Sequence, residues 1–469
     1  MFLLARLIIF ENIFQKEIKL YIMQIGIKSL GCPKNFVDTE VICGKLREKG
    51  YQISEKIDHS DIVIINTCGF IRDAVEESIE EILNLVKLKK EGKIKHIIVT
   101  GCLPQRYKDD NLNQEFPEVD AFLGVGDLLK IDIIVKNILQ GEQIFKVSPK
   151  PNFLYDYHTP RTILTPQHYA YIKISEGCQN NCSYCLIPQI RGNYRSRKME
   201  DIIEEAKILG EKKNLSEIIL IGQDTTLYGL DLYGEYKLAE LLKKLSLLEL
   251  NHLKWIRFLY THPAHYNDEL IEVIANYTKI CPYLDLPLQH ISDKILKRMN
   301  RPVKRNYVIS LINKLRERIP NLTLRTTFMV GFPGETDQDF EELLNFVKKY
   351  RFERLGAFVF SREEGTPAYN FPQQIPLRIK KERLKKLMLT QQSISKKINY
   401  SYLGKEIEVL VDEIKSGKPK IALGRTKGDA PEIDGKVVIR GDKTTKVGKF
   451  IKVKVTEASE YDLAGEISK

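Results

Sequence analysis

Three cysteines, Cys178, Cys182 and Cys185, are spaced C-x3-C-x2-C, and this spacing is the strongest chemical signal in the chain. Cysteine thiolates are the usual ligands of iron–sulfur clusters, which normally take four of them. Three thiolates can hold a four-iron cluster by three corners and leave one iron open, by the logic of open catalytic metal sites. Structural zinc is the alternative, but such sites usually have four ligands in two pairs, and no matching second pair follows. The spacing therefore favours a cluster with one open iron.

A second group of three cysteines is dispersed through the first third of the chain. Cys32, Cys68 and Cys102 each follow a predicted strand. Those strands are predicted at residues 24–30, 61–65 and 96–100. Because the carboxyl ends of parallel strands face one crevice where ligands bind, we expect the three thiols to converge. One such cysteine alone would more often be a buried structural residue, but three at equivalent positions predict a second three-cysteine cluster.

Polar side chains at other predicted strand ends are candidate cofactor contacts. Gln223 and Asp224 follow the second strand of the central part of the chain, and Gln289 follows the fourth. We expect all three to contact a cofactor, with ordinary turns between strand and helix as the alternative interpretation. His290 could transfer a proton, although a lone histidine is more often structural. The sequence identifies no catalytic side chain.

The elements that must position these residues alternate between strand and helix. In the first third, predicted helices at residues 38–49 and 72–90 separate the strands, which indicates an α/β domain with a doubly wound parallel sheet. The middle repeats strand and helix about six times, which indicates a partial (β/α)6 barrel whose active site lies at the strand carboxyl ends. Its strands are predicted at residues 169–174, 218–221, 255–259, 283–286, 323–330 and 357–360.

The remaining segments connect and follow this barrel. Residues 148–166 hold four prolines and show little periodicity, which predicts a linker. A basic helix is predicted at residues 377–398. From about Tyr402 the pattern changes to short β-runs at residues 407–411, 436–439 and 450–455, separated by glycine and aspartate. This pattern predicts a small C-terminal β-barrel of about 70 residues.

Length and composition fit a multidomain globular protein. The 469 residues are 43% hydrophobic and carry a formal net charge of +11, which suits an anionic partner such as RNA, although solvated surface lysines explain it equally well. No apolar run reaches the roughly 20 residues that cross a bilayer, and no secretory signal is recognised, so we expect a cytoplasmic protein. In that reducing compartment cysteines favour metal ligation over disulfides. Cys43 and Cys281 fit neither cluster and are expected in the core.

The C-x3-C-x2-C spacing resembles the signature of the radical S-adenosylmethionine superfamily. The resemblance implies that the open iron binds the amino and carboxylate groups of S-adenosylmethionine, and that one electron then cleaves it to methionine and a 5′-deoxyadenosyl radical. With a second cysteine set and a small C-terminal barrel, the chain from about Met23 onward resembles the radical S-adenosylmethionine methylthiotransferase family, and all six cysteines match. That family implies two 4Fe–4S clusters, the second delivering sulfur, and a second S-adenosylmethionine that supplies the methyl group.

The same resemblance implies a division of the chain. Residues 1–22 are an N-terminal extension or a mis-called start, and 23–147 form the methylthiotransferase domain with the second cluster. The linker at 148–166 leads to the radical S-adenosylmethionine domain at 167–400 and to a TRAM domain at 401–469.

Several motifs are similar to the ribosomal-protein branch of the family, at residues 31–35 (GCPKN), 286–290 (LPLQH), 361–366 (SREEGT) and 429–435 (DAPEIDG). This branch implies a substrate, the β-carbon of an aspartate in small-subunit ribosomal protein S-twelve, free or on the ribosome. It also implies an external electron donor, a sulfur source and no membrane. Residues 402–469 carry 14 basic and 12 acidic side chains, a balance that suits a protein partner better than RNA phosphates. A tRNA methylthiotransferase acting on a modified adenosine and a non-catalytic, metal-stabilised RNA-binding protein are the alternatives.

Overall fold

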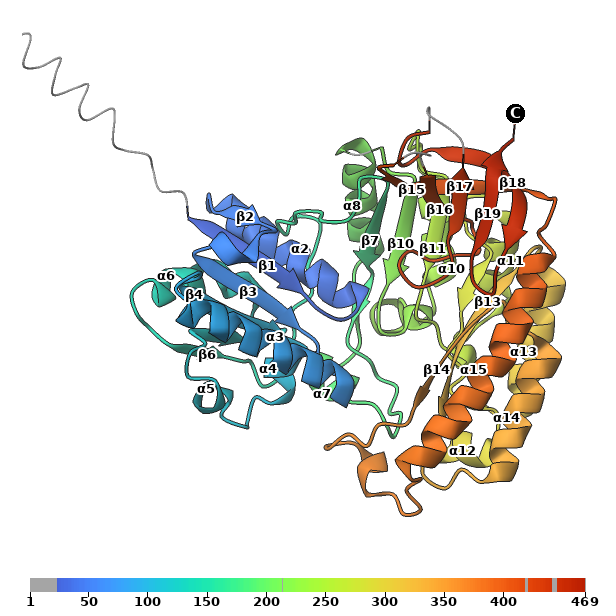
Figure 1. Ribbon diagram of the computed structural model, residues 1–469, viewed down its shortest axis with the longest axis horizontal. Helices are drawn as coiled ribbons and strands as arrows, with labels where there is room; N and C mark the ends of the chain where they lie inside the picture. Colours follow the sequence, from blue (N-terminus) through green and yellow to red (C-terminus); the bar gives the residue numbers. More distant parts are fainter. Residues whose placement is uncertain (1–22, 213, 418–420, 441–444, 469) are drawn as a thin grey trace, which may run out of the picture. The chain divides into compact units, whose positions relative to one another are not determined.

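The computed structural model describes residues 23–212, 214–417, 421–440 and 445–468 (Figure 1). The expectation for residues 1–22 therefore lies outside the described residues. The described chain forms two compact units. The first contains residues 23–69, 73–149 and 160–162, and the second contains residues 70–72, 150–159 and 163–468. No helix in the described ranges combines the length and apolar character needed to cross a membrane.

The first unit is a doubly wound α/β domain around a six-stranded, fully parallel sheet, as the alternating pattern predicted. The strand order is β2-β1-β3-β4-β5-β6, so β1 lies between β2 and β3. The strands are β1 (Gln24–Ser29), β2 (Gln52–Ser54), β3 (Ile62–Thr67), β4 (His96–Gly101), β5 (Ala121–Leu123) and β6 (Ile144–Lys146). The helices are α2 (Pro33–Glu48), α3 (Arg72–Lys90), α4 (Cys102–Arg106), α5 (Leu112–Glu115) and α6 (Ile131–Ile138).

A continuous apolar run places β3 in the middle of this sheet. All six residues of β3 are buried, and four of them are isoleucine or valine, as expected for a strand covered on both faces. One face packs against α3, whose Ile82 and Leu85 join the same apolar cluster as Val63 and Ile65. These contacts hold the carboxyl ends of the central strands at one edge of the sheet.

The second unit contains a partial barrel of six parallel strands in two three-stranded sheets, β11-β10-β7 and β12-β13-β14. The strands are β7 (Tyr169–Lys173), β10 (Glu217–Ile221), β11 (Trp255–Phe258), β12 (Tyr283–Asp285), β13 (Thr323–Val330) and β14 (Arg354–Val359). The six predicted strands are thus all present. The two sheets meet at β11, where the Cys281 amide donates to the Ile256 carbonyl at 2.9 Å.

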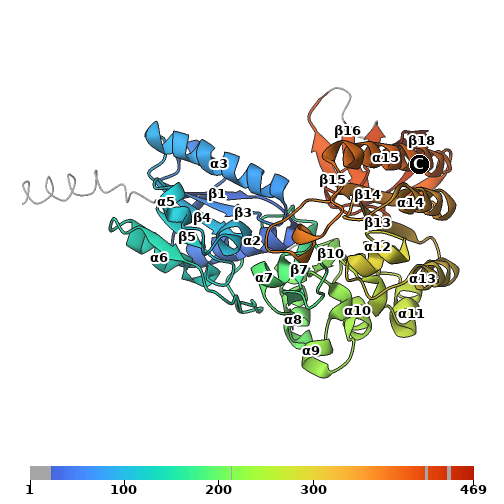
Figure 2. The same cartoon turned by 90° about the horizontal axis from the view of Figure 1, so that it is seen from below.

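Helices cover the outside of these strands, as Figure 2 shows for the helices that join them. The long ones are α8 (Met199–Lys212), α10 (Leu238–Ser246), α11 (Asp268–Asn276), α13 (Arg305–Arg318) and α14 (Asp337–Tyr350). Their apolar faces and the strands form one continuous core that includes Ile218, Leu241 and Leu343.

A closed five-stranded barrel follows α15 (Leu377–Tyr400), with strand order β15-β16-β17-β19-β18. The strands are β15 (Glu406–Lys415), β16 (Ile421–Arg425), β17 (Val437–Arg440), β18 (Phe450–Ala458) and β19 (Leu463–Ile467). The β-runs identified in the sequence correspond to β15, β17 and β18, whereas β16 and β19 were missed. Each missed strand contains a glycine, Gly424 or Gly465, where a Cβ would lie 2.4 or 2.3 Å from a backbone oxygen of a neighbouring strand. Glycine is required there by close packing, and it weakens the strand signal in the sequence.

The small barrel packs on the amino-terminal ends of the six parallel strands. Buried Glu217 at the start of β10 lies between two buried arginines, Arg257 of β11 at 2.8 Å and Arg425 of β16. The Trp255 ring meets the Phe450 ring edge-on at 4.9 Å between centroids. The small barrel therefore covers one end of the partial barrel and leaves the strand carboxyl ends for chemistry.

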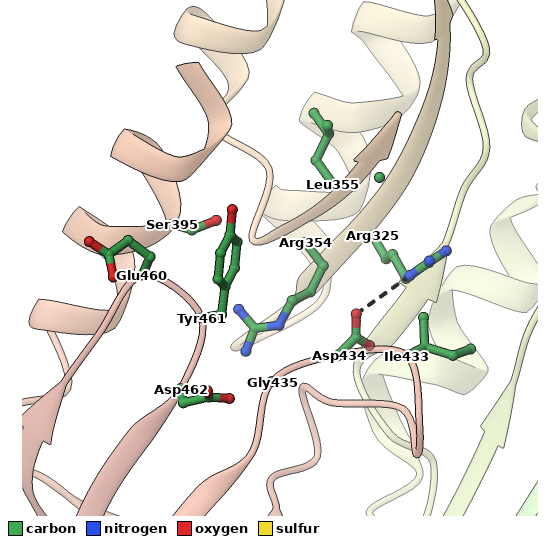
Figure 3. A pocket seen from close by; sticks show the side chains of 11 residues that line it. Arg325, Arg354, Leu355, Ser395, Ile433, Asp434, Gly435, Glu460, Tyr461 and Asp462 are labelled. Atoms are coloured by element: carbon green, nitrogen blue, oxygen red, sulfur yellow. Dashed lines mark ion pairs between the residues drawn. The ribbon is translucent and has the colours of Figure 1, made fainter. Parts of the chain in front are cut away.

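A polar pocket of about 250 Å³ lies at this junction, beside α15 (Figure 3). Its lining includes Arg325 and Arg354, and carboxylates of the small barrel hold both guanidinium groups. Arg325 Nε lies 3.5 Å from Asp434, and Arg354 Nε donates to Asp429 at 3.0 Å. These ion pairs join the small barrel to β13 and β14.

The junction gives a testable consequence for stability. Replacing Glu217 by alanine leaves two arginines buried without their shared carboxylate, so we expect the free energy of unfolding to fall by about 3–5 kcal/mol. Trp255 is the only tryptophan of the chain and lies at this contact, so its fluorescence during urea unfolding reports the change. Glu408→Gln is the control, because Glu408 forms an exposed 3.8 Å pair with Lys254 across the same junction. The control should lose less than about 1 kcal/mol; equal losses would contradict the role given to Glu217.

Candidate metal-cluster sites

The three dispersed cysteines lie at the carboxyl ends of three neighbouring strands of the first unit. Cys32 follows β1 and precedes α2, Cys68 follows β3, and Cys102 begins α4 directly after β4. In the sheet β3 lies between β1 and β4, and the strand order reverses at β1. Such a reversal point is where open α/β sheets bind ligands.

Glycines next to these cysteines bring their segments into contact. A Cβ at Gly31 would lie 2.8 Å from the Cys68 Cβ and 3.1 Å from its Sγ. A Cβ at Gly69 would lie 2.8 Å from the Cys102 carbonyl oxygen. The segment of Cys32 therefore touches that of Cys68, which touches that of Cys102. The absence of side chains at these two positions allows the three segments that carry the cysteines to approach one another closely.

Two asparagines of the same motifs link the strand ends. The Asn35 amide donates to the Leu30 carbonyl at 2.7 Å and, at 3.3 Å, to the carbonyls of Asn66 and Thr67. The Asn66 amide donates in return to the Asn35 carbonyl at 2.8 Å. This reciprocal pair fixes the loop that carries Cys32 against the end of β3. Both residues stand within three positions of a predicted ligand, which is the only signal for them in the sequence.

The motif cysteines of the second unit lie in a loop between β8 (Ser175–Glu176) and α7 (Ile187–Arg191). Burial, and then nearby groups that include the Cys182 thiol, raise the pKa of Cys178 to about 11 and that of Cys185 to about 12. The three thiols belong to one short loop, in which the Cys185 amide donates to the Cys182 carbonyl at 3.1 Å. Buried thiols favour the neutral form unless a cation stabilises the thiolate, and metal ions do this outright. The donor set therefore fits a thiolate-bound metal cluster.

A buried ionic group supports this loop from the side of β7. Glu176 immediately precedes Gly177 and Cys178, and its Oε2 atom pairs with Lys173 Nζ at 2.7 Å and with Arg191 at 3.3 Å. Its Oε1 atom accepts a hydrogen bond from Gln223 Nε2 at 2.6 Å. Although burial opposes ionisation, Lys173 and Arg191 lower the pKa of Glu176 to about 2, so this carboxylate stays charged. Glu176 was not predicted as a functional residue, and the only signal for it is its place next to the cysteine motif.

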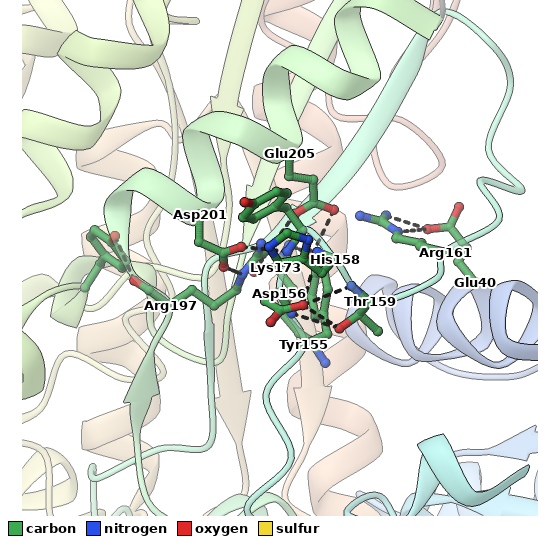
Figure 4. Close-up of polar contacts among 12 residues, drawn as sticks. Glu40, Tyr155, Asp156, His158, Thr159, Arg161, Lys173, Arg197, Asp201 and Glu205 are labelled. Carbon is green, nitrogen blue, oxygen red and sulfur yellow. Dashed lines mark hydrogen bonds and ion pairs between the residues drawn. The ribbon is translucent and has the colours of Figure 1, made fainter.

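Tyr155, within the predicted linker, is part of the same support (Figure 4). Its hydroxyl accepts a hydrogen bond from the Lys173 amide at 3.1 Å and donates to Glu205 Oε2 at 3.2 Å. The Arg197 guanidinium pairs with Glu205 at 2.5 Å and lies 4.1 Å from the Tyr155 ring centroid. Tyr155 is only 2% exposed, so its aromatic ring is a core element of the second unit.

Asp224, predicted as a cofactor contact, also holds the cysteine loop. Its Oδ2 atom accepts a hydrogen bond from Asn180 Nδ2 at 2.8 Å, and Asn180 lies between Cys178 and Cys182. The same oxygen lies 3.1 Å from His265 Nδ1. Although burial opposes it, this contact lowers the pKa of Asp224.

Asp224, His262 and His265 offer three potential ligand atoms within 4.8 Å of one another. His262 Nδ1, however, accepts a hydrogen bond from the Ala264 amide at 3.2 Å. Burial and the nearby charge of Arg301 lower the pKa of His262 to about 2. A neutral His262 therefore carries its proton on Nε2 and is a hydrogen-bond donor at this strand end.

The other predicted contacts lie at the strand carboxyl ends with buried polar atoms. Gln223 Oε1 and Gln289 Oε1 are both buried and have no hydrogen-bond partner among the residues that the structure describes. The Gln289 backbone adopts a φ of 68° and bonds to β13 on both sides, through Thr327 and Met329. His290 is fully buried, with Nδ1 accepting from the Ser292 amide at 3.0 Å. Cys43 and Cys281 are fully buried away from these loops, as predicted.

Comparison with known proteins gives three family matches along the chain. Residues 24–124 match the uncharacterized protein family UPF0004, residues 172–347 match the radical SAM superfamily, and residues 403–467 match the TRAM domain. The UPF0004 match covers the three dispersed cysteines. The radical SAM match covers the C-x3-C-x2-C loop and most of the partial barrel; it leaves out the first three residues of β7 and the whole of β14.

Relatives with a single printed function align over nearly the whole chain. The protein of Clostridioides difficile strain 630 is 46% identical over 95% of this chain and 99% of its own length. The protein of Thermoanaerobacter strain X514 is 49% identical over 94% and 99%, and that of Heliobacterium modesticaldum is 47% identical over 95% and 95%. All three are called ribosomal protein uS12 methylthiotransferase RimO.

Solved structures share the fold at low sequence identity. The radical S-adenosylmethionine methyltransferase TsrM from Kitasatospora setae, with cobalamin and a 4Fe–4S cluster bound, aligns with a TM-score of 0.55 and 13% identity. That alignment covers 74% of this chain and 73% of TsrM. TsrM with tryptophan and a S-adenosylmethionine analogue gives a TM-score of 0.54 at 12% identity, over 79% and 89% of the two chains. At this identity the likeness concerns the fold alone.

Proposed function

The chain belongs to the RimO family of ribosomal protein uS12 methylthiotransferases, and on this premise we propose which residues carry the family's chemistry in it. It is a radical S-adenosylmethionine methylthiotransferase that uses two 4Fe–4S clusters and S-adenosylmethionine. When bound, these cofactors supply the one-electron chemistry needed to open an unactivated C–H bond, which no side-chain base could do. The residues of the chain bind the cofactors, orient them and exclude water.

Cys178, Cys182 and Cys185 hold the cluster that binds S-adenosylmethionine, and the three dispersed cysteines hold the second one. The observation that carries this assignment is that each set is gathered at the carboxyl ends of parallel strands. In the first unit glycines admit the contacts between segments, and in the second burial, with the neighbouring Cys182 thiol, raises the pKa of Cys178 and of Cys185. Such thiols need a bound cation to ionise.

Gln223 and Gln289 contact S-adenosylmethionine. Their buried, unpaired amide oxygens lie just after the carboxyl ends of β10 and β12. A bound ammonium group would donate hydrogen bonds to such acceptors. Asp224 contacts the cofactor with its carboxylate, which also accepts a hydrogen bond from Asn180 of the cluster loop. Asp224 thereby links the cofactor to that loop. The buried ionic group of Lys173, Glu176 and Arg191 supports that loop from the side of β7.

The substrate is ribosomal protein uS12, modified at the β-carbon of an aspartate. The C-terminal barrel of the enzyme, which is nearly neutral, is the surface that binds uS12. Residues 402–469 carry a net charge of only +2, which supports a protein substrate rather than tRNA. The reaction also requires an external electron donor and a sulfur source. We place the enzyme in the cytoplasm, because thiolate ligands persist in a reducing compartment. Residues 23–147, 167–400 and 401–469 are the functional domains, joined by the linker at 148–166.

The test of the substrate is a direct competition. Anaerobically reconstituted enzyme with S-adenosylmethionine, a reductant and a sulfur source is offered a uS12 peptide carrying the aspartate together with a tRNA carrying modified adenosine. We expect mass spectrometry to find a methylthio group on the peptide alone. The control is the same peptide with glycine in place of the aspartate, because glycine has no β-carbon. Methylthiolation of the tRNA alone would overturn the protein substrate and leave the cluster chemistry intact.

A further inference from the structure

The cysteine loop of the second unit is hydrogen-bonded to a short segment that lies more than 100 residues further along the chain. This segment, residues 298–301, comprises the last residue of α12 (Asp293–Arg298) and the turn that follows. The Ser183 amide donates to the Met299 carbonyl at 3.0 Å, and the Ser183 hydroxyl donates to the Arg298 carbonyl at 2.8 Å. The Asn300 amide donates to the Asn181 carbonyl at 2.7 Å. Cys182 is thus flanked on both sides by residues fixed to this turn.

Arg301 completes the turn with a contact to the ligand itself. Its Nη1 atom lies 3.9 Å from Cys182 Sγ, within hydrogen-bonding distance for sulfur, and its Nη2 atom donates to the Pro287 carbonyl at 2.8 Å. Arg301 is only 8% exposed. Among the described residues no carboxylate is paired with Arg301, and its Nη1 atom faces the Cys182 thiol and, at 3.5 Å, the Tyr184 hydroxyl.

We propose that Arg301 sets the reduction potential of the cluster held by Cys178, Cys182 and Cys185, through a charge-assisted hydrogen bond to the Cys182 thiolate. This proposal rests on the proposed function, because it presumes that these cysteines hold the cluster. One electron from an external low-potential reductant adds one negative charge at the site, and the guanidinium stabilises that added charge more than the oxidised state. Hydrogen bonds to the sulfurs and nearby charge are known determinants of cluster potential. Arg301 is a positioning residue that acts through Cys182.

The expected size of the effect follows from the strength of one such bond. The bond to the thiolate is present in both oxidation states, so only the difference in its strength between them shifts the equilibrium, and we expect this difference to be about tenfold. Loss of the bond between Arg301 and Cys182 should lower the ratio of reduced to oxidised cluster about tenfold at a fixed ambient potential. For a one-electron couple this corresponds to a shift of the reduction potential by about 59 mV to more negative values.

The experiment is a redox titration of the full-length reconstituted protein, followed by electron paramagnetic resonance without S-adenosylmethionine. The signal that changes when S-adenosylmethionine is added to a parallel sample identifies the cluster of interest. We expect Arg301→Met to show the shift to more negative potential and Arg301→Lys to show a smaller one. Arg298→Met is the matched control, because the Arg298 side chain donates to the Pro333 carbonyl at 2.9 Å and leaves the thiol untouched. Its potential should equal that of the unaltered protein.

The possible results separate the proposal from competing roles. An unchanged potential in an Arg301→Met protein of full iron content would overturn it, and a weaker affinity for S-adenosylmethionine in that protein would then assign Arg301 to the cofactor. Loss of the cluster from both Arg301 variants but not from Arg298→Met would also overturn it, in favour of a purely structural role. A responsive signal that persists in Cys182→Ala would instead reject the cluster assignment beneath the proposal.

Discussion

Replacing Cys182 by alanine should reduce the formation of 5′-deoxyadenosine to the level of a reaction without enzyme. Cys182 is the middle cysteine of the motif. Its neighbours on both sides are hydrogen-bonded to the turn at residues 298–301, and its thiol is the one that Arg301 contacts. Two remaining thiolates cannot hold three corners of a cluster, so electron transfer to S-adenosylmethionine loses its route. Chromatography of the reaction products measures the loss, and iron analysis should show one cluster fewer per chain.

Cys281→Ala is the control for this variant. Cys281 is a fully buried cysteine of the same unit and lies just before the start of β12, whereas the motif loop follows β8. Its replacement removes a thiol of the same kind without touching the predicted ligands, so cleavage of S-adenosylmethionine should continue. If deoxyadenosine still forms with Cys182→Ala, the assignment of this cluster is wrong.

Replacing Cys68 by alanine should have a different effect of equal size. Cys68 follows β3, and its segment touches both the Gly31 segment and, through Gly69, that of Cys102. Its loss removes the central ligand of the proposed second cluster while the motif loop of the other unit keeps all its thiols. We therefore expect S-adenosylmethionine cleavage to persist and the methylthio product to disappear, both followed by mass spectrometry in one reaction.

The paired control is Cys43→Ala. Cys43 lies fully buried in α2 of the same unit, where burial raises the pKa of its thiol to about 12. Because Cys43 lies in the middle of a helix and not at a strand end, we expect it not to be a ligand, and the variant should make product. An unchanged yield of methylthiolated peptide from Cys68→Ala would show that the dispersed cysteines do not deliver sulfur.

The elements of the fold were predictable where the pattern is local. The helix Arg72–Lys90 and the strand Thr323–Val330 have the bounds that periodicity predicts. The helix predicted at residues 38–49 begins earlier, at Pro33, because proline in the first turn favours a helix start. The strand predicted at residues 357–360 begins at Arg354, whose guanidinium is held by Asp429 of the small barrel. That pairing is tertiary and leaves no local trace in the sequence.

The same distinction applies to the site. Six cysteines could be selected from the sequence because spacing and strand ends are local signals. Arg301 could not be selected, because it stands 119 positions from the thiol that it contacts and nothing near it in the sequence indicates a metal site. Asp224 was selected as a cofactor contact, and its bond to Asn180 became visible only in three dimensions. Residues that bind are therefore easier to find than residues that position the binders.

The burial of Tyr155 determines how the second unit can be studied in isolation. A fragment that begins at residue 167, after the proline-rich stretch, lacks the phenol that bonds to the Lys173 amide and to Glu205. Without Tyr155, the Arg197 and Glu205 ion pair would be open to water. This pair lies beside the end of β7, where the Arg197 guanidinium donates to the Lys173 carbonyl, three residues before Glu176. A fragment meant to fold and take up iron should therefore include Tyr155 and begin near Lys150, where the chain returns to this unit.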